Sequence, residues 1–316
     1  MTQLSEPDER RSHHGFELNP ADEALLRGPV PAQALRWVSQ SLGPSGRVLA
    51  AEALAGGTSS AVHAVRVDTG GSGVRELVLR RFVHADWLAE EPDTPTREAK
   101  ALELLADVGL PTPRLVAADP DGSQAGAPSV LMTRLPGSVE WEPRVVEEFL
   151  RALAEPLPII HSVCVAAGGV LPCYRPYPLL MRRPPAWAAR PDVWERAFDV
   201  FDGDSLSQER LFVHRDYHPG NVLWARGRVS GIVDWVNASV GSPWADVGHC
   251  RVNIASELGQ QAADRFLELY RAVSGSTDDY HPYWDISAAI GGLDEDADGQ
   301  PSPADEAFLA AAVARL

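Results

Sequence analysis

Residues 211–223 read Leu-Phe-Val-His-Arg-Asp-Tyr-His-Pro-Gly-Asn-Val-Leu, and the rest of the chain is best understood from this stretch. Its polar centre has an apolar run on each side, which predicts a loop between two short strands. Residues 231–235, Gly-Ile-Val-Asp-Trp, follow after a predicted hairpin. The pattern therefore predicts that Asp216, Asn221 and Asp234 lie near one another.

These three side chains offer the oxygen atoms that a phosphate-bound metal and a hydroxyl nucleophile require. Mg²⁺ prefers hard oxygen ligands, so Asn221 and Asp234 are candidate metal ligands. Asp216 is the candidate catalytic base, because a carboxylate can orient a hydroxyl and take its proton. The alternative is an ordinary loop in which Asp and Asn serve turns. The complete set, with His214 and Arg215 before the first aspartate, favours the catalytic interpretation.

Two histidines of the same stretch, His214 and His218, have the spacing of a zinc pair on a helix. The Pro219-Gly220 pair that follows them predicts a loop instead. We therefore expect His214 to be structural and bonded to the backbone. Arg215 is either a surface residue or an ion-pair partner.

The composition bounds the classes of partner. The 316 residues carry a formal net charge of −16 and are 45% hydrophobic, as is ordinary for one large or two smaller globular domains. The negative charge argues against nucleic acid as a partner. It is compatible with a cationic small-molecule substrate, and solubility alone is the other explanation. The one lysine, Lys100, follows an alanine, which excludes a P-loop.

Targeting signals are not expected. No run of eighteen apolar residues is present, so we expect no membrane span. Residues 1–15 lack the apolar core of a secretory signal and are expected to form a disordered leader. The cysteines, Cys164, Cys173 and Cys250, form no CxxC pair and are expected to be reduced thiols in a cytoplasmic protein.

The hydrophobic pattern divides the chain into a strand-rich part and a mainly helical part. Strands are expected at residues 48–54, 61–67, 77–82, 114–118 and 129–134. Helices are expected at 20–42 with a break at 28–31, at 95–108 with Thr96 as cap, and at 143–165, 191–201, 255–273 and 303–316. The predicted fold is α+β, with a small N-terminal lobe at 16–134 that holds an antiparallel sheet and a helix, a hinge about 133–137, and a larger lobe at 138–316.

The first lobe offers candidate contacts for a nucleotide. Arg80 and Arg81 would point to opposite faces of a strand, and Glu98 could hold Arg80 by an ion pair. The alternative is two solvent-facing arginines. Further candidates are Gly56, Gly57, Ser59 and Ser60 in a turn, and Thr133 and Leu135 in the hinge. The turn could bind phosphates through backbone N–H groups or be a plain hairpin, and the hinge residues could instead pack in the core.

The acidic segment 278–298 has two interpretations. With Trp284 and Asp285 it could bind a cationic or sugar-like ligand. A solvated acidic face is the simpler explanation.

Together these features resemble the aminoglycoside phosphotransferase family, a branch of the protein-kinase-like fold. The matching features run from residue 56 to residue 246: the glycine turn, Arg80 and Glu98, residues 131–137, His161, the 211–223 loop and Ile232-Val233-Asp234-Trp235. Residues 242–248 also resemble that family. The resemblance implies a bilobal fold with the active site in the cleft between lobes. It implies ATP or GTP as phosphoryl donor, Mg²⁺ on Asn221 and Asp234, and Asp216 as base. It also implies Asp246 as a structural anchor.

The implied reaction is transfer of a γ-phosphoryl group to a hydroxyl of a small molecule, such as an aminoglycoside, another amino alcohol or a sugar. Three positions depart from the family pattern: Arg80 replaces lysine, Ser60 replaces asparagine, and Arg215 replaces glycine. They leave the chemistry intact but put the substrate in doubt. A non-catalytic nucleotide-binding pseudokinase and a metal-dependent phosphohydrolase are the alternative functions.

Overall fold

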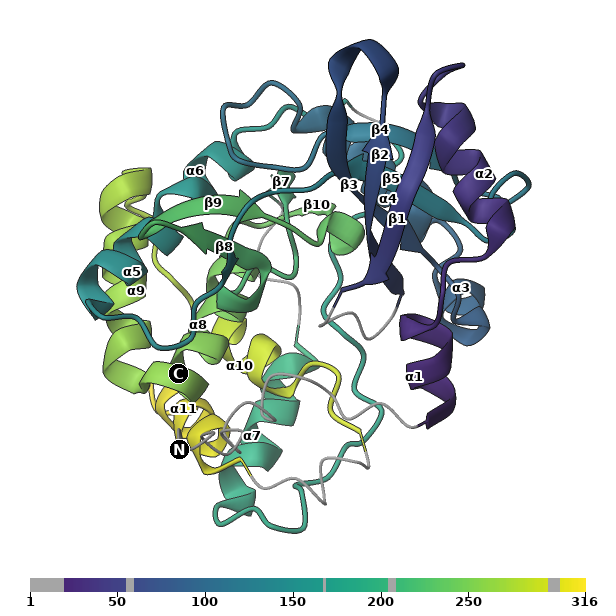
Figure 1. Ribbon diagram of the computed structural model, residues 1–316. Helices are drawn as coiled ribbons and strands as arrows, with labels where there is room; N and C mark the ends of the chain where they lie inside the picture. The colour runs from purple at the N-terminus through teal and green to yellow at the C-terminus, as the bar shows by residue number, and fades with distance from the viewer. Residues whose placement is uncertain (1–19, 55–59, 167–168, 204–208, 295–301) are drawn as a thin grey trace, which may run out of the picture. The chain divides into compact units, whose positions relative to one another are not determined.

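The computed structural model describes residues 20–54, 60–166, 169–203, 209–294 and 302–316, and the chain divides into two compact units (Figure 1). The first unit comprises the chain up to Ala99 together with Arg114–Arg134, and the second comprises Lys100–Pro113 and Leu135–Leu316. Residues 100–113, expected in the first lobe, thus group with the second unit. The reason is visible at Pro111, whose carbonyl accepts a 2.8 Å hydrogen bond from the Ile232 N–H.

The first unit is built on a five-stranded antiparallel sheet. Its strands, in the order β1-β2-β3-β5-β4, are β1 Arg47–Ala53, β2 Ala61–Asp68, β3 Val74–Arg81, β5 Ser129–Thr133 and β4 Leu115–Asp119. All five strands expected from the sequence are present, because β-branched and apolar residues alternate between turn residues. With the helices of both units, they give the predicted α+β class.

One face of this sheet forms the core of the first unit. Val65, Val67 and Leu79 on that face are fully buried and pack against Trp37 and Val38 of helix α2 (Ala32–Ser41). Helix α1 (Pro20–Arg27) precedes α2, and the break between them falls at residues 28–31 as expected. Side chains alternate along a strand, so neighbouring positions such as Arg80 belong to the opposite face.

Two further helices complete the first part of the chain, α3 (Ala85–Glu90), which the sequence pattern did not predict, and α4 (Thr94–Leu104). The expected cap at Thr96 is wrong, since α4 begins at Thr94, whose hydroxyl donates to the Glu91 carbonyl at 2.8 Å. The helix also ends before the prolines that were expected to end it.

The second unit is mainly helical. Its helices are α5 Val146–Ala154, α6 Pro156–His161, α7 Pro191–Phe201, α8 Trp244–Leu258, α9 Gln260–Ser274, α10 Tyr283–Ile290 and α11 Pro303–Val313. Its strands form two small sheets, β6-β8-β9 and β10-β7, from β6 Ser138–Val139, β7 Leu211–Val213, β8 Val222–Ala225, β9 Arg228–Ile232 and β10 Ser239–Gly241. Among the described residues, no helix has the length and apolarity needed to cross a bilayer.

Two helices predicted as continuous are each divided. The predicted helix 143–165 is wrong, because Pro156 has no backbone N–H to continue the hydrogen bonds of α5 and instead begins a new helix, α6. The predicted helix 255–273 is wrong, because Gly259 has φ of 87° and separates α8 from α9. By contrast, α7 and the β8–β9 hairpin lie where the sequence predicts them.

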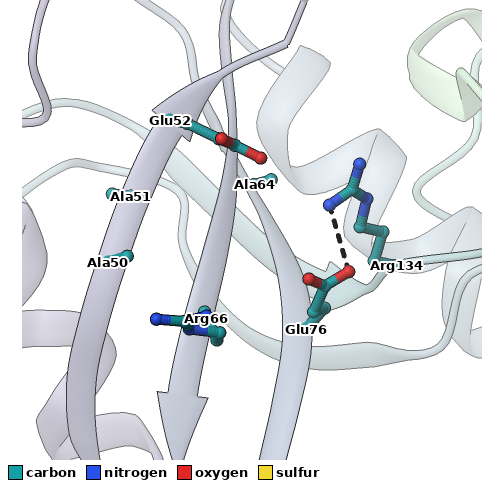
Figure 2. Close-up of a pocket in the computed structure, with 7 residues that line it drawn as sticks. All are labelled: Ala50, Ala51, Glu52, Ala64, Arg66, Glu76 and Arg134. Carbon is teal, nitrogen blue, oxygen red and sulfur yellow. Dashed lines mark hydrogen bonds and ion pairs between the residues drawn. The ribbon is translucent and has the colours of Figure 1, made fainter.

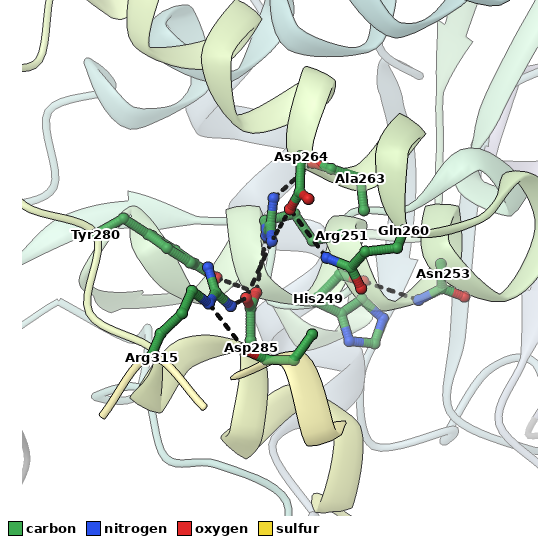
Figure 3. A network of polar contacts seen from close by, with 10 residues as sticks. His249, Arg251, Asn253, Gln260, Ala263, Asp264, Tyr280, Asp285 and Arg315 are labelled. Atoms are coloured by element: carbon green, nitrogen blue, oxygen red, sulfur yellow. Dashed lines mark hydrogen bonds and ion pairs between the residues drawn. The ribbon is translucent and has the colours of Figure 1, made fainter. Parts of the chain in front are cut away.

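A buried charge network fixes helix α8 (Figure 3). The Arg251 guanidinium donates from Nε to Asp285 Oδ1 at 2.8 Å and from a terminal nitrogen to Oδ2 at 3.1 Å, and both side chains are fully buried. Tyr280 donates to Asp285 Oδ1 at 2.5 Å, and Arg315 contacts Oδ2. Burial opposes the charge of Arg251, but the Asp285 carboxylate raises the pKa of the guanidinium above its usual value.

This network corrects the interpretation of the acidic segment. Asp285 does not belong to a solvated face, because it pairs with Arg251 inside the unit. Asp278 and Asp279 are exposed, as a solvated face requires. Residues 295–298 of the same segment lie outside the described residues.

Candidate active site

The loop after β7 has a strained backbone that one carboxylate holds. Arg215 has φ of 69°, a left-handed conformation that is costly for a residue with a side chain. The Asp246 carboxylate of α8 accepts hydrogen bonds from the backbone N–H groups of His214 at 2.9 Å and Arg215 at 2.6 Å. His161 at the end of α6 lies 3.1 Å from the same carboxylate. These contacts offset the strain and give Asp246 the anchoring geometry that the sequence resemblance implies.

His214 is structural, as predicted. Its Nε2 lies 3.0 Å from the Val233 carbonyl, while its Nδ1 lies 3.3 Å from the Asp216 N–H. A carbonyl only accepts and an N–H only donates, so the proton of this ring sits on Nε2. The fully buried ring thereby joins the loop to the segment that carries Asp234.

The structure brings Asp216 and Asn221 into direct contact. The Asn221 amide nitrogen donates to the Asp216 carbonyl at 2.9 Å and to its Oδ2 at 3.2 Å. Because the nitrogen is turned to Asp216, the amide oxygen of this buried side chain is the atom suited to a metal. The Val233 N–H donates to the Asn221 carbonyl at 3.0 Å, and Asp234 is the next residue, with φ of 67°.

A residue that the sequence did not predict completes this group. His249 of α8 places Nε2 3.0 Å from Asp216 Oδ1, and both side chains are partly buried. Burial works against the negative charge of Asp216, but the hydrogen bond and charge of His249 hold the pKa of that carboxyl well below its usual range. The sequence offered a signal for His249 that was missed, because the stretch that resembles the family was taken as residues 242–248 and His249 is the next residue.

His218 adds a second imidazole beside the same carboxylate. Ligand atoms of Asp216, His218 and His249 all lie within 4.8 Å of one another, and the two rings meet edge to face at 5.7 Å between centroids. The histidine pair considered from the sequence, His214 with His218, is therefore not the one that the fold assembles. Burial lowers the pKa of His218 to about 4, so this ring is neutral at pH 7.

The titration of His218 predicts a measurable pH dependence of stability. A histidine in the unfolded chain has a pKa near 6.5, so the unfolded state binds the proton more tightly than the folded state does. The stability that depends on this group is complete above about pH 6.5, falls as the pH drops from there, and is lost below about pH 4, with a loss of about 2 kcal/mol at pH 5. His218→Asn should remove this loss, because an asparagine oxygen can replace Nδ1 as acceptor for the Gly220 N–H.

The measurement is the urea midpoint of each protein at about pH 7.5 and pH 5. His281→Asn is the matched control, because exposed His281 makes the same local contact, with the Tyr283 N–H donating to its Nδ1. A wild-type midpoint that falls no more than that of His218→Asn would contradict the prediction.

In the first unit, Arg80 and Glu98 form the predicted pair. Arg80 Nε lies 3.3 Å from Glu98 Oε1, and the side chains are 9% and 0% exposed. This burial excludes the alternative of two solvent-facing arginines. Ser60 is also buried, directly before β2, whereas Gly56, Gly57 and Ser59 lie outside the described residues.

A hollow lies on the sheet face that carries Arg80 (Figure 2). Val62 pairs with Arg80 across β2 and β3, and Arg66 pairs with Glu76 four positions further on. Because side chains alternate along a strand, these positions share one face. Arg66 and Glu76 line the hollow, whose volume is about 150 Å³, and Arg134 donates to Glu76 at 3.0 Å.

The two predicted hinge residues make different local contacts. Thr133 ends β5, and its hydroxyl accepts a 2.8 Å hydrogen bond from the Arg114 N–H. Leu135 packs its side chain beside Gly231 of β9, where a Cβ atom would lie 3.0 Å from it. Thr133 belongs to the first unit and Leu135 to the second.

The family is decided by comparison with known proteins. Residues 50–283 match the family model of the "Phosphotransferase enzyme family". The chain belongs to this phosphotransferase family. The family and the enzyme class expected from the sequence are thereby confirmed, and the matched region contains the whole Asp216 group. A curated relative, "Acyl-CoA dehydrogenase family member 10" of Mus musculus, is 26% identical over 193 residues, which cover 55% of this chain and 18% of that protein.

Solved phosphotransferases share the fold. A mutant of aminoglycoside phosphotransferase APH(4)-Ia in complex with ADP and hygromycin B has a TM-score of 0.58 and 16% identity, covering 89% of this chain and 97% of that one. Macrolide 2'-phosphotransferase type I has a TM-score of 0.56 and 21% identity, covering 95% of this chain and 98% of that one. Macrolide 2'-phosphotransferase MphH of Brachybacterium faecium has a TM-score of 0.56 and 16% identity, covering 90% of this chain and 98% of that one. The predicted kinase-like α+β fold is confirmed.

Proposed function

We propose that this phosphotransferase moves the γ-phosphoryl group of ATP or GTP to a hydroxyl of a small molecule, with Asp216 as the base. The observation that carries the proposal is the state of the Asp216 carboxylate. It is ionised at neutral pH and bonded to both His249 and Asn221. The Asp246 carboxylate holds its loop by accepting hydrogen bonds from the backbone N–H groups of His214 and Arg215. A carboxylate so fixed can receive the proton of an acceptor hydroxyl without rearranging.

The oxygen set of Asn221 and Asp234 fits Mg²⁺, which favours carboxylate and amide oxygens. Bound there, Mg²⁺ would neutralise charge on the donor phosphates. The chain's own contribution is positional: Asp216 holds the amide nitrogen of Asn221, and the Val233 N–H holds its carbonyl. We therefore assign Asn221 and Asp234 to the metal.

For the donor nucleotide we propose the sheet face of the first unit that carries Arg80. A guanidinium held by a buried carboxylate is a fixed cation, as donor phosphates require. The hollow on the same face, lined by Arg66 and Glu76, offers room for part of the donor. We also assign Ser60, the turn residues Gly56, Gly57 and Ser59, and the hinge residues Thr133 and Leu135 to nucleotide binding. Because the reaction consumes a nucleoside triphosphate, we place it in the cytoplasm.

The buried Arg80–Glu98 pair also bears on the alternatives. A pseudokinase was suggested by arginine in the place of lysine, but Arg80 forms the ion pair that a working donor site needs. Two of the similar solved structures are named as macrolide 2'-phosphotransferases, and a third is bound to ADP and hygromycin B. An acceptor of this general kind is proposed here.

The test is product analysis with Mg-ATP and Mg-GTP and a panel of aminoglycosides, macrolides, sugars and amino alcohols. Phosphorus NMR should show a new phosphate ester and nucleoside diphosphate in equal amounts. Inorganic phosphate as the sole phosphorus product would identify a hydrolase. Nucleotide that binds but is not consumed with any acceptor would identify a pseudokinase.

A further inference from the structure

Three side chains with metal-binding atoms meet at the candidate base. Asp216 and His218 come from the loop after β7, and His249 comes from helix α8. One ligand atom of each residue lies within 4.8 Å of the ligand atoms of the other two. Two imidazoles and one carboxylate are a donor set that binds zinc and keeps a fourth coordination position open.

The tightest pair of this group already has close to the spacing of a zinc site. Zinc bonds of about 2.0–2.1 Å in a tetrahedral arrangement place neighbouring ligand atoms roughly 3.4 Å apart. His249 Nε2 and Asp216 Oδ1 lie 3.0 Å apart, and a zinc ion would replace the proton between them. The ligand atom of His218 exceeds the zinc spacing by at most about 1.4 Å, which a rotation of its side chain can close.

Contacts outside the group hold the carboxylate in place. The Asn221 amide nitrogen donates to Asp216 Oδ2 at 3.2 Å, which leaves Oδ1 on the side of His249. The loop itself is held by the hydrogen bonds that Asp246 accepts. The ligands are therefore positioned by contacts that do not depend on a metal, and zinc could bind Oδ1 without displacing Asn221.

The ring of His218 makes one hydrogen bond that metal binding would replace. The Gly220 N–H donates to its Nδ1 at 3.2 Å. Ligation through Nδ1 uses that lone pair, and ligation through Nε2 moves the ring proton to Nδ1. Either route exchanges one long, neutral hydrogen bond for a metal–nitrogen bond. We therefore expect a reversible site and not a permanently loaded structural one.

The group is accessible to an ion from solvent. The side chains of His249 and Asp216 are 22% and 25% exposed, and His218 is also only partly buried. Structural zinc sites are closed by four protein ligands, whereas this group offers three. An ion bound here would keep a position for water or for an oxygen of the acceptor.

The donor set separates this group from the proposed magnesium ligands. Asn221 and Asp234 offer oxygen, which Mg²⁺ prefers. Imidazole nitrogen favours zinc over magnesium, so His218 and His249 select a different ion. Excess Mg²⁺ should therefore not displace zinc from the histidines.

We propose that Asp216, His218 and His249 form a reversible zinc site, and that zinc bound there switches off phosphoryl transfer. The metal would occupy Oδ1 of Asp216 while the Asn221 amide occupies Oδ2, so the carboxylate would lose the basicity that the reaction needs. The inhibitory effect rests on the proposed function, because it takes Asp216 as the base. The site itself rests on the donor set and its geometry.

The binding experiment uses metal-free full-length protein without nucleotide. Cobalt(II) should produce visible absorption bands that zinc(II) removes, and zinc affinity is measured by competition with a chromogenic chelator. His218→Asn and His249→Gln should each weaken zinc binding at least about ten-fold, because each removes one imidazole ligand. His281→Asn, at an exposed histidine, is the matched control and should leave the affinity unchanged.

Both replacements keep a local hydrogen bond. Asparagine at position 218 retains an acceptor for the Gly220 N–H, and glutamine at position 249 retains a donor for Asp216 Oδ1. Tm values close to that of the wild type show that the variants are folded.

Inhibition is measured as turnover of the acceptor that product analysis identifies. Mg-nucleotide is in excess, and a chelator buffer fixes the free zinc because nucleotides also bind zinc. The free zinc that halves turnover should lie close to the zinc dissociation constant of the wild type. It should rise at least about ten-fold in His218→Asn and His249→Gln, each compared with its own zinc-free turnover.

The outcomes separate the zinc site from the proposed function. Zinc binding that is absent, or that both histidine variants retain, would overturn the site. Retained binding is the pattern of the exposed thiols of Cys164 and Cys173, and binding lost only in Asp234→Asn is that of the magnesium ligands. Zinc bound by the three residues without loss of turnover would overturn the inhibitory role. If no acceptor is phosphorylated even without zinc, the proposed function fails, and the binding data still decide the site.

Discussion

Asp216→Asn is expected to lower kcat by about 10²–10⁴-fold, the usual contribution of a general base. Asparagine keeps the shape and an oxygen for the Asn221 amide, but it cannot accept the proton of the acceptor hydroxyl. The dissociation constant of Mg-nucleotide should change little, because Arg80, Asn221 and Asp234 are intact. Steady-state kinetics and nucleotide titration of the same preparation measure the two quantities.

The control is Asp192→Asn, which removes a carboxylate that is 75% exposed on α7. It should retain the kcat of the wild type. If Asp216→Asn also retains turnover close to wild type, the base lies elsewhere. If it loses nucleotide binding as well, the residue acts on the donor site and not on the acceptor proton.

Asp285→Asn is expected to have the largest effect on stability, about 3–5 kcal/mol. Removing one partner of a buried ion pair leaves the other charge in the interior with less compensation. Here that charge is Arg251, which binds Asp285 through two nitrogens and would keep the half-exposed Asp264 as its remaining carboxylate partner among the described residues (Figure 3). The urea midpoint and the Tm should both fall, measured by circular dichroism under one set of conditions.

Asp279→Asn is the control, because Asp279 is an exposed carboxylate of the same acidic segment. It should change the free energy of unfolding by less than about 0.5 kcal/mol. Since α8 carries Asp246 and His249 as well as Arg251, any folded Asp285→Asn protein should also show impaired turnover. A midpoint equal to that of the control would mean that the network contributes nothing to stability.

Local pattern was enough to predict the strands of the first unit, helix α7 and the β8–β9 hairpin. These elements depend on alternation and turn residues within a few positions. The two long helices were predicted wrongly because a single proline or glycine divides each of them into two. Pro156 and Gly259 lie inside apolar stretches whose periodicity continues across them, so the pattern predicted continuous helices.

The sequence by itself determined the family, the loop with Asp216 and Asn221, and the Arg80–Glu98 pair, because each is a specific motif or an adjacent pair of elements. Only the tertiary structure decided that His249 bonds Asp216 and that Asp285 is buried. It also decided that His218 lies beside the same carboxylate. The reason is that the burial of a side chain and the pKa of a titratable group depend on residues that are distant in sequence and come into contact only when the helices pack. The local periodicity of the sequence carries no information on those contacts.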